Sequence, residues 1–527
     1  MNTQVTTAVD SLRRAEPQKL FVQGPSNCGG VVMVFPVELL ASVVIIFVVT
    51  RFGSLLDVVH RPFRNIKCGM VLSAAGQYHL VPFPTRPRSL LAHPFFEEFE
   101  TLLMLLICAL PQFLFLEFLT CAPGATPFDL AFCTLLALLL FTVRGMLLAQ
   151  VQGSHKYLIL AGVGGSTLAL VLMSCLPAGT LDFDLEGASA DLSVQVSAFL
   201  SQSLHVPQPF VLGAASLYLA LAMLAGVLTS ALGIPAFEFA RCYNMLLTAQ
   251  GAETTGGLRL LLHANFFLPL VAALGWVPPL ATDLLCAGLG EPGSAGAAAC
   301  HQRIVGGRLL VVGACALLRL WLMRSHVQAH YNSEVVTAHR SLEVALADAP
   351  LPAPPAKGST DEPPVPAAVA ALAGSLRTRQ RLLCWRCLQY VSPALLQISL
   401  LLMLKNRVRY DMGFCAMVPG ADWMPQRLAA SSARSAANLA KAGEAMGAGA
   451  KLKVLQAFKQ HTFVTPTFYE PVLGFLLWWC CAAWFVLCAL ALLHWQSTPG
   501  TQAHLATEHA VESAPQDRTT KCKPKTK

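Results

Sequence analysis

No charged side chain interrupts PVLGFLLWWCCAAWFVLCALALL, residues 471–493, near the C-terminal end of the chain. A helix of about 20 apolar residues crosses the roughly 30 Å hydrocarbon core of a bilayer. Similar stretches precede this one, and eight to ten of them fit the pattern. The best count is nine spans, at about 31–50, 101–121, 128–149, 157–176, 210–232, 258–280, 304–324, 382–404 and 471–493.

Composition agrees with this pattern. The 527 residues are 55% hydrophobic and 13% charged, and the mean hydropathy is +0.56. These values predict an all-α, polytopic membrane helical bundle. The net charge of +8 does not indicate nucleic-acid binding, because the basic residues flank spans, where they orient the chain and contact anionic lipid headgroups.

The spans divide the chain into two membrane parts separated by a Pro/Ala-rich linker. No loop exceeds about 70 residues, so the sequence leaves no room for a soluble catalytic domain. The expected segments are a polar tail at 1–30, membrane bundle at 31–332, the linker at 333–381, membrane bundle at 382–494 with a basic loop at 405–470, and a basic tail at 495–527.

Nine spans place the two termini on opposite sides, named side A for the N-terminus and side B for the C-terminus. The side B loop 51–100 is rich in Arg, whereas the side A loop 177–209 is acidic, which favours side B as cytoplasmic. Against this, the side A loop 405–470 carries nine Lys and Arg residues. Cys286 and Cys300 share one side A loop and would be able to pair if that side is extracellular.

Polar side chains inside the spans are the candidate functional residues, because an ionised group in a membrane is costly and needs a partner. Glu117 and Arg308 lie at a similar depth near side A and would be able to form an ion pair. The others form a basic, polar layer nearer side B. The full set is Glu117, Arg144, His263, Asn265, Arg308, Arg319, His326, Gln389 and Tyr390.

The seventh span carries an ordered polar stripe. Arg308 and Arg319 are separated by almost three whole helical turns, so they share one helix face. His326 and His330 continue this stripe toward side B. One interpretation is that the arginines reach lipid phosphates at the interfaces or pair structurally. The other is a permeation or ligand-binding role.

Other features predict structure rather than chemistry. Ala222, Gly226 and Ser230 form a small-residue ridge for helix packing, and Trp478 and Trp479 lie in mid-span, where core packing is expected. The sequence contains no HExxH, GxSxG or Walker motif and no zinc-type Cys/His set. We therefore expect no catalytic residue, metal site or cofactor. A membrane enzyme using His263 and Glu117 is disfavoured, because the two lie near opposite membrane faces.

Several segments resemble the transmembrane protein 161 family. The resemblance is carried by LRLLLHANFFLPL (258–270), RLLVVGACALLRLWLMRSHVQAHYN (308–332), CLQYVSPALLQISLLLML (387–404) and LLWWCCAAWF (476–485), and more weakly by GIPAFEFARCYNML (233–246). It covers roughly residues 95–495 and includes every candidate site residue. The polar N-terminal tail and the lack of a glycosylation sequon depart from the family pattern.

The resemblance implies a multi-pass, non-enzymatic protein linked to stress resistance and to membrane excitability, including potassium and calcium currents and cardiac rhythm. Association with ion channels at the plasma membrane, rather than an endomembrane, is the first hypothesis. The second is a channel or transporter with an intramembrane basic or polar site. The sequence does not decide between pore and modulator, and it leaves the oligomeric state open.

Overall fold

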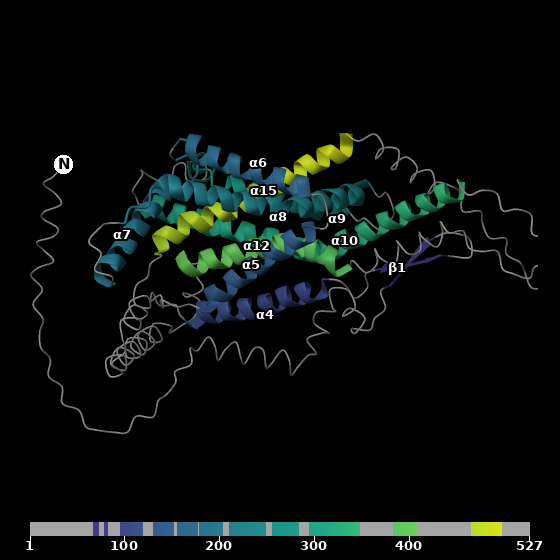
Figure 1. Ribbon diagram of the computed structural model, residues 1–527, viewed down its shortest axis with the longest axis horizontal. Helices are drawn as coiled ribbons and strands as arrows, with labels where there is room; N and C mark the ends of the chain where they lie inside the picture. Colours follow the sequence, from purple (N-terminus) through teal and green to yellow (C-terminus); the bar gives the residue numbers. More distant parts are fainter. Residues whose placement is uncertain are drawn as a thin grey trace, which may run out of the picture.

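The computed structural model describes residues 67–72, 78–82, 95–119, 130–151, 155–177, 179–203, 210–248, 256–283, 295–347, 383–408 and 465–497. Their main feature is a bundle of long helices that lie side by side (Figure 1). The helices are α4 (Phe96–Leu119), α5 (Leu130–Val151), α6 (His155–Cys175), α7 (Leu185–Ser203), α8 (Ala214–Thr248), α9 (Gly256–Leu274), α10 (Ala295–Ala347), α12 (Leu383–Val408) and α15 (Pro466–Ser497), with a π-helical turn η4 (Pro279–Asp283).

Five described helices contain segments that are long and apolar enough to cross a membrane, namely Ala214–Thr248, Gly256–Leu274, Arg303–Ser333, Leu383–Asn406 and Thr467–Ser497. Two shorter apolar segments, Phe132–Leu148 and Ile159–Cys175, belong to α5 and α6. The helical membrane bundle is therefore confirmed, but the count of nine spans is not. The predicted span 31–50 lies outside the described residues, and span 101–121 corresponds to α4.

A two-stranded antiparallel sheet accompanies the bundle, in addition to the helices that the sequence predicts. Strands β1 (Lys67–Leu72) and β2 (Tyr78–Pro82) pair with an irregularity between Lys67 and Gly69. Both strands contact α10, whose end extends past the other helices in Figure 1. The hairpin lies in the segment 51–100 that the sequence places outside the membrane.

The predicted small-residue ridge packs against α6. A Cβ atom added at Gly226 would lie 2.6 Å from the Gly162 carbonyl oxygen and would also clash with Ser166. On the same interface, a Cβ at Gly165 would lie 2.5 Å from Thr229 Oγ1. Small residues on both helices thus let their backbones approach closely, as expected for helix association in lipid.

Tryptophans of α15 fix this helix against α8. Trp478 and Trp479 are 9% and 3% exposed, which confirms their predicted core position. The indole Nε1 of Trp479 donates to the Ala225 carbonyl oxygen and to Thr229 Oγ1, each at 3.0 Å. A buried indole N–H needs such partners, so these bonds fix the register of the two helices.

Several helices differ from the prediction, and α10 (Ala295–Ala347) continues into the predicted linker 333–381. The acidic loop 177–209 contains α7, whose first turn is capped by Asp184 Oδ1 accepting from the Gly187 N–H at 2.8 Å. Helix α8 continues for 35 residues through Pro235, well past the predicted end at 232. This extension brings Glu238 and Arg241 into the bundle, and both matter for the site described below.

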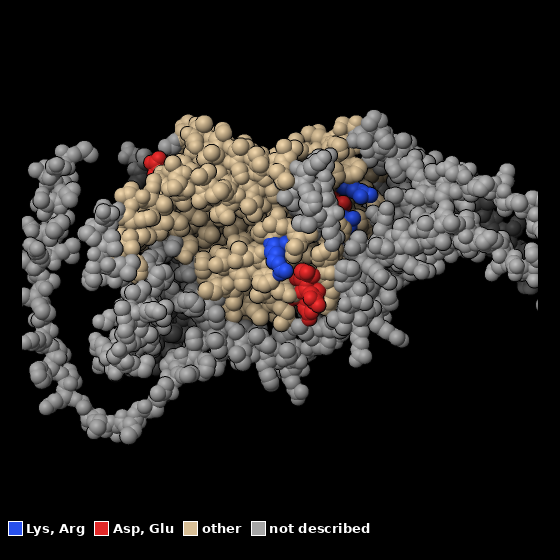
Figure 2. Space-filling view, viewed as in Figure 1, with Lys and Arg blue, Asp and Glu red and all other residues tan. Residues whose placement is uncertain are grey.

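The outside of the bundle is apolar. Large exposed hydrophobic residues are spread over several helices, for example Leu160 at 70% and Trp321 at 72% exposure. Figure 2 shows a described face that is almost free of Lys, Arg, Asp and Glu, apart from a few small groups. Such a surface suits contact with lipid tails rather than water.

Candidate functional site

The polar stripe of α10 is buried inside the protein. Arg308, Arg319, His326 and His330 are only 7%, 0%, 1% and 7% exposed. The four residues therefore share the face of α10 that packs against neighbouring helices, as their spacing predicted. For Arg319, the interpretation that its side chain reaches lipid phosphates is wrong, because the whole residue is enclosed by protein.

At the side A end of the stripe, Arg308 has a carboxylate partner. Its Nη1 donates to Asp182 Oδ2 at 2.6 Å, and the Asp182 N–H donates to the Trp276 carbonyl oxygen at 3.1 Å. Asp182 precedes α7 and is missing from the predicted set. The predicted partner, Glu117, has a side chain that lies outside the described residues, and the observed partner is Asp182.

A cavity of about 350 Å³ opens beside this ion pair, between α7, α10 and the start of α15. Its polar lining includes Asp182, Asp184, Asp191, Arg308 and Glu470. Four carboxylates and one guanidinium give this end of the bundle an acidic character. Among the described residues, no group of three His, Cys, Asp or Glu side chains is close enough to hold a metal ion.

Near the middle of the stripe, Arg319 lies in an aromatic cage. Its Cζ is 4.0 Å from the ring centroid of Trp484 on α15 and 5.8 Å from that of Phe239 on α8. Within the described part of the chain, none of its three nitrogens has a hydrogen-bond acceptor. Cation–π contacts are the only attractive polar interactions that these residues give the guanidinium.

Further along α10 from the cage, His326 joins this helix to α12 and α8. Its Nδ1 is 3.1 Å from both the Leu322 carbonyl oxygen and the Tyr390 hydroxyl. The imidazole also stacks on Phe239, with 5.0 Å between ring centroids. His326 and Tyr390, two predicted site residues, are therefore brought together, and the buried amide of Asn265 lies beside the same tyrosine.

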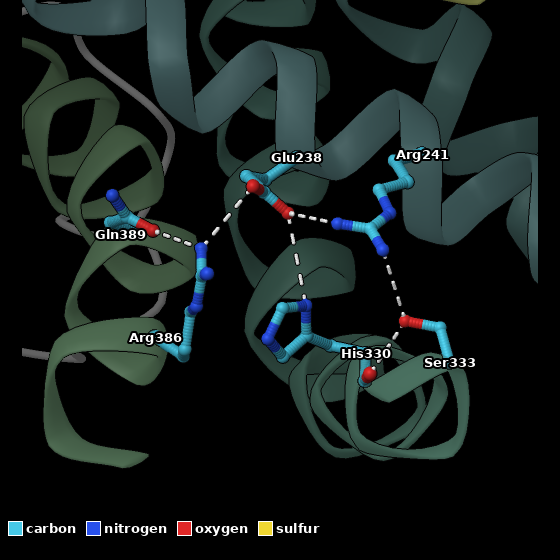
Figure 3. A network of polar contacts seen from close by, with 6 residues as sticks. All are labelled: Glu238, Arg241, His330, Ser333, Arg386 and Gln389. Atoms are coloured by element: carbon cyan, nitrogen blue, oxygen red, sulfur yellow. Dashed lines mark hydrogen bonds and ion pairs between the residues drawn. The ribbon is translucent and has the colours of Figure 1, made fainter. Parts of the chain in front are cut away.

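The side B end of the stripe is an ion-pair network around Glu238 (Figure 3). The carboxylate lies 3.3 Å from Arg386 Nη1, 3.7 Å from His330 Nδ1 and 3.9 Å from Arg241 Nη1. Arg386 also donates to Gln389 Oε1 at 3.3 Å, which joins this predicted residue to the network. The network links α8, α10 and α12, with one carboxylate facing two arginines and a histidine.

Two predicted residues stay outside this core. Arg144 is exposed, with its Cζ 5.9 Å from the Phe141 ring on the same helix, as expected of a side chain that reaches the interface. His263 is also exposed, and its Nδ1 is 2.8 Å from the Tyr243 hydroxyl. The basic layer near side B therefore divides into buried and lipid-facing parts.

The cysteines that the sequence singles out differ in their bonding. Cys384 and Cys387 are 0% exposed in α12, where buried cysteines serve packing. Cys300 is disulfide-bonded. The predicted pairing with Cys286 stays a prediction.

Sequence reasoning missed the partners of the stripe, which are Asp182, Glu238, Arg241, Arg386 and Trp484. One signal was available, since Glu238 and Arg241 stand at i and i+3, a spacing that puts them on one helix face. Pro235 masks this signal, because a proline usually ends a helix. Trp484 carries no comparable signal, because only tertiary packing brings it to Arg319.

Comparison with known proteins agrees with the membrane architecture. No solved structure matches the chain. The model of a family described as predicted transmembrane protein 161AB matches residues 76–341 and 378–498. The matched segments include α4 to α9, most of α10, α12 and α15, and so contain every residue of the buried stripe and its partners. The chain is therefore a multi-pass membrane protein that belongs to the transmembrane protein 161AB family.

Proposed function

We propose that the protein is a non-enzymatic regulator of membrane excitability that associates with ion channels and adjusts potassium and calcium currents. Roles in cardiac rhythm and in cellular stress resistance belong to the same proposal. It rests on family membership and on what that resemblance implies. We place the protein in the plasma membrane, in contact with anionic lipid headgroups.

The observation that carries the proposal is the complete burial of Arg319, midway along the polar stripe, at 0% exposure. An open pore along this stripe would bring water to the guanidinium. The stripe is instead packed among helices and held at its ends by Asp182 and by Glu238. A stripe enclosed in this way suits a protein that acts on a partner channel rather than one that conducts ions itself.

Side A is the extracellular side in this proposal. The disulfide at Cys300 supports this orientation, since disulfides persist in oxidising compartments. The channel partner would meet the apolar outer surface within the membrane, where exposed side chains such as Trp321 and Leu160 are available for helix packing. This contact does not require the interior stripe to open.

The alternative is a channel or transporter with an intramembrane basic site. It is favoured by the nitrogens of Arg319, which have no acceptor among the described residues, because buried donors without acceptors are costly unless a ligand satisfies them. In this alternative the closed stripe would be one state of a transport cycle, and a second state would expose Arg319 to one side of the membrane.

Two measurements separate these functions. The first is ion and anion flux through the purified protein in liposomes. The second is whole-cell recording of a co-expressed potassium or calcium channel with and without the protein. The regulator predicts altered channel currents and no liposome flux. The conduit predicts liposome flux that Arg319→Gln abolishes and that the exposed control Arg303→Gln leaves unchanged. That result would refute the regulator and support a channel or transporter.

A further inference from the structure

We propose that the cage of Arg319 is a binding site for one small inorganic anion of halide size. The inference goes beyond the regulator function and does not depend on it. It is carried by the charge, the enclosure and the donors of the cage that have no acceptor among the described residues, all on the helices α8, α9, α10 and α15.

The first step is the unbalanced charge of Arg319. An arginine side chain is a cation with five N–H donors and no acceptor. Arg319 is 0% exposed, and within the described residues it has no acceptor at Nε, Nη1 or Nη2. Contact with the Trp484 and Phe239 rings offsets only part of the cost of burying a cation. A bound anion would supply the negative charge and the hydrogen-bond acceptors that the described side chains do not give Arg319.

The carboxylate on the turn of α8 that also carries Phe239 is already engaged. It belongs to Glu238, which faces Arg241, Arg386 and His330. Arg241, Arg386 and Arg319 thus set three guanidinium groups against this one carboxylate in the described polar core near side B. The excess of positive charge attracts an anion.

The second step is an excess of unused donors beside the guanidinium. Trp484 Nε1 is buried and has no acceptor among the described residues, although its ring contacts Arg319. Asn265, fully buried and next to Tyr390, makes no well-formed hydrogen bond through Nδ2 within the same part of the chain. Indole, amide and guanidinium N–H groups are the donors that a halide ion accepts from, and buried donors are rarely left unsatisfied.

The third step concerns size. The neighbours within electrostatic range of Arg319 include Cys315, Cys481 and Cys488, whose side chains are small and buried. Arg319 itself is 0% exposed and is therefore sealed from solvent. A monatomic anion needs about the space of one water molecule, so these enclosed surroundings favour it over a tetrahedral oxyanion or a lipid headgroup.

The test measures thermal unfolding of the purified full-length protein in detergent micelles, in sodium chloride, bromide, sulfate and gluconate at equal ionic strength. We expect a saturable rise in Tm of several degrees in chloride and bromide over gluconate, because a ligand that binds only the folded state stabilises it. The Tm in sulfate should be no higher than the Tm in gluconate. Sulfate as effective as chloride would overturn the size argument.

The matched variants are Arg319→Gln, Asn265→Ala and, as control, Arg303→Gln, which removes an exposed arginine from the same helix. Arg319→Gln should abolish the halide effect, Asn265→Ala should raise the half-saturating chloride concentration about tenfold, and the control should match the wild type. An equal halide effect in Arg319→Gln would refute the site.

A direct measurement covers the case in which a variant fails to fold. Equilibrium dialysis of the wild-type protein with radioactive chloride should find one bound ion per chain, displaced by bromide and not by gluconate. Absence of bound chloride in folded wild-type protein would refute the proposal without any variant. Neither outcome decides whether the protein modulates channel currents, so the two proposals fail separately.

Discussion

Replacing Arg319 with Met should stabilise the protein in halide-free buffer. The substitution keeps an unbranched side chain in the cage and removes a cation that is 0% exposed and without an acceptor among the described residues. Burying an ion costs several kcal/mol even after relaxation, while cation–π contact with Trp484 at 4.0 Å returns about 2 kcal/mol. Replacement of buried ionic groups by apolar ones of similar volume gains about 1–4 kcal/mol, and we expect a value in this range.

The assay is reversible unfolding in sodium gluconate and again in sodium chloride, for the wild type, Arg319→Met and the surface control Arg303→Met. In gluconate the variant should be more stable than the wild type. In chloride the difference should shrink, because only the wild type gains from the bound anion. The control should stay within about 0.5 kcal/mol of the wild type in both salts.

A clear destabilisation of Arg319→Met in gluconate, by more than about 1 kcal/mol, would refute the reasoning. It would mean that the guanidinium has a favourable partner in the folded protein that outweighs its desolvation. Costly buried groups persist in proteins where function needs them. If Arg319→Met stabilises the protein and leaves its effect on channel currents unchanged, the cage is not needed for that function.

Three further substitutions test the packing and the ends of the stripe. Gly226→Ala should cost about 1–3 kcal/mol of unfolding free energy by overpacking against α6, while Gly233→Ala, with open space around it, should be neutral or better. Asp182→Asn leaves Arg308 buried without its carboxylate and should cost about 1–3 kcal/mol of unfolding free energy. We expect the low end because Asp182 is 36% exposed. Adding Arg308→Met should recover part of this loss in a double-mutant cycle. Glu238→Gln removes the carboxylate that faces two arginines and a histidine and should cost about 2–4 kcal/mol, whereas an unchanged denaturation midpoint would mean that the network is not stabilising.

The stripe could be predicted from the sequence because it depends only on the spacing of residues within one helix. A spacing of almost three whole turns puts Arg308 and Arg319 on one face of any helix, and the histidines follow the same rule. What that face meets is not local, since Trp484 lies on α15, far from Arg319 along the chain. The prediction that Arg319 reaches lipid is wrong for this reason: hydropathy shows that a residue is inside a span, but not which side of the span faces protein.

The missed elements have equally definite causes. Helix α7 mixes polar and apolar residues, so it falls below any hydropathy threshold for a span, although Asp184 marks its start with an N-cap. Helix α8 continues past Pro235, and a proline inside a membrane helix is tolerated when neighbouring groups satisfy the freed backbone. Hydropathy alone therefore places Glu238 in a loop, whereas the structure places it in the core.

Arg144 and Arg319 show how the position of a charge around its helix decides the cost of that charge in this bundle. The sequence predicts a similar depth for both, near the side B ends of their spans. Arg144 is exposed and lies over Phe141, where its charge can reach headgroups or water at little cost. Arg319 has no such route, because Trp484 and Phe239 close the cage. Apolar residues of similar size would fill that volume at lower free energy, so a cation there indicates selection for something other than stability. The other buried cations of the stripe have carboxylates, Asp182 at one end and Glu238 at the other, so the uncompensated charge of the described core is concentrated at Arg319.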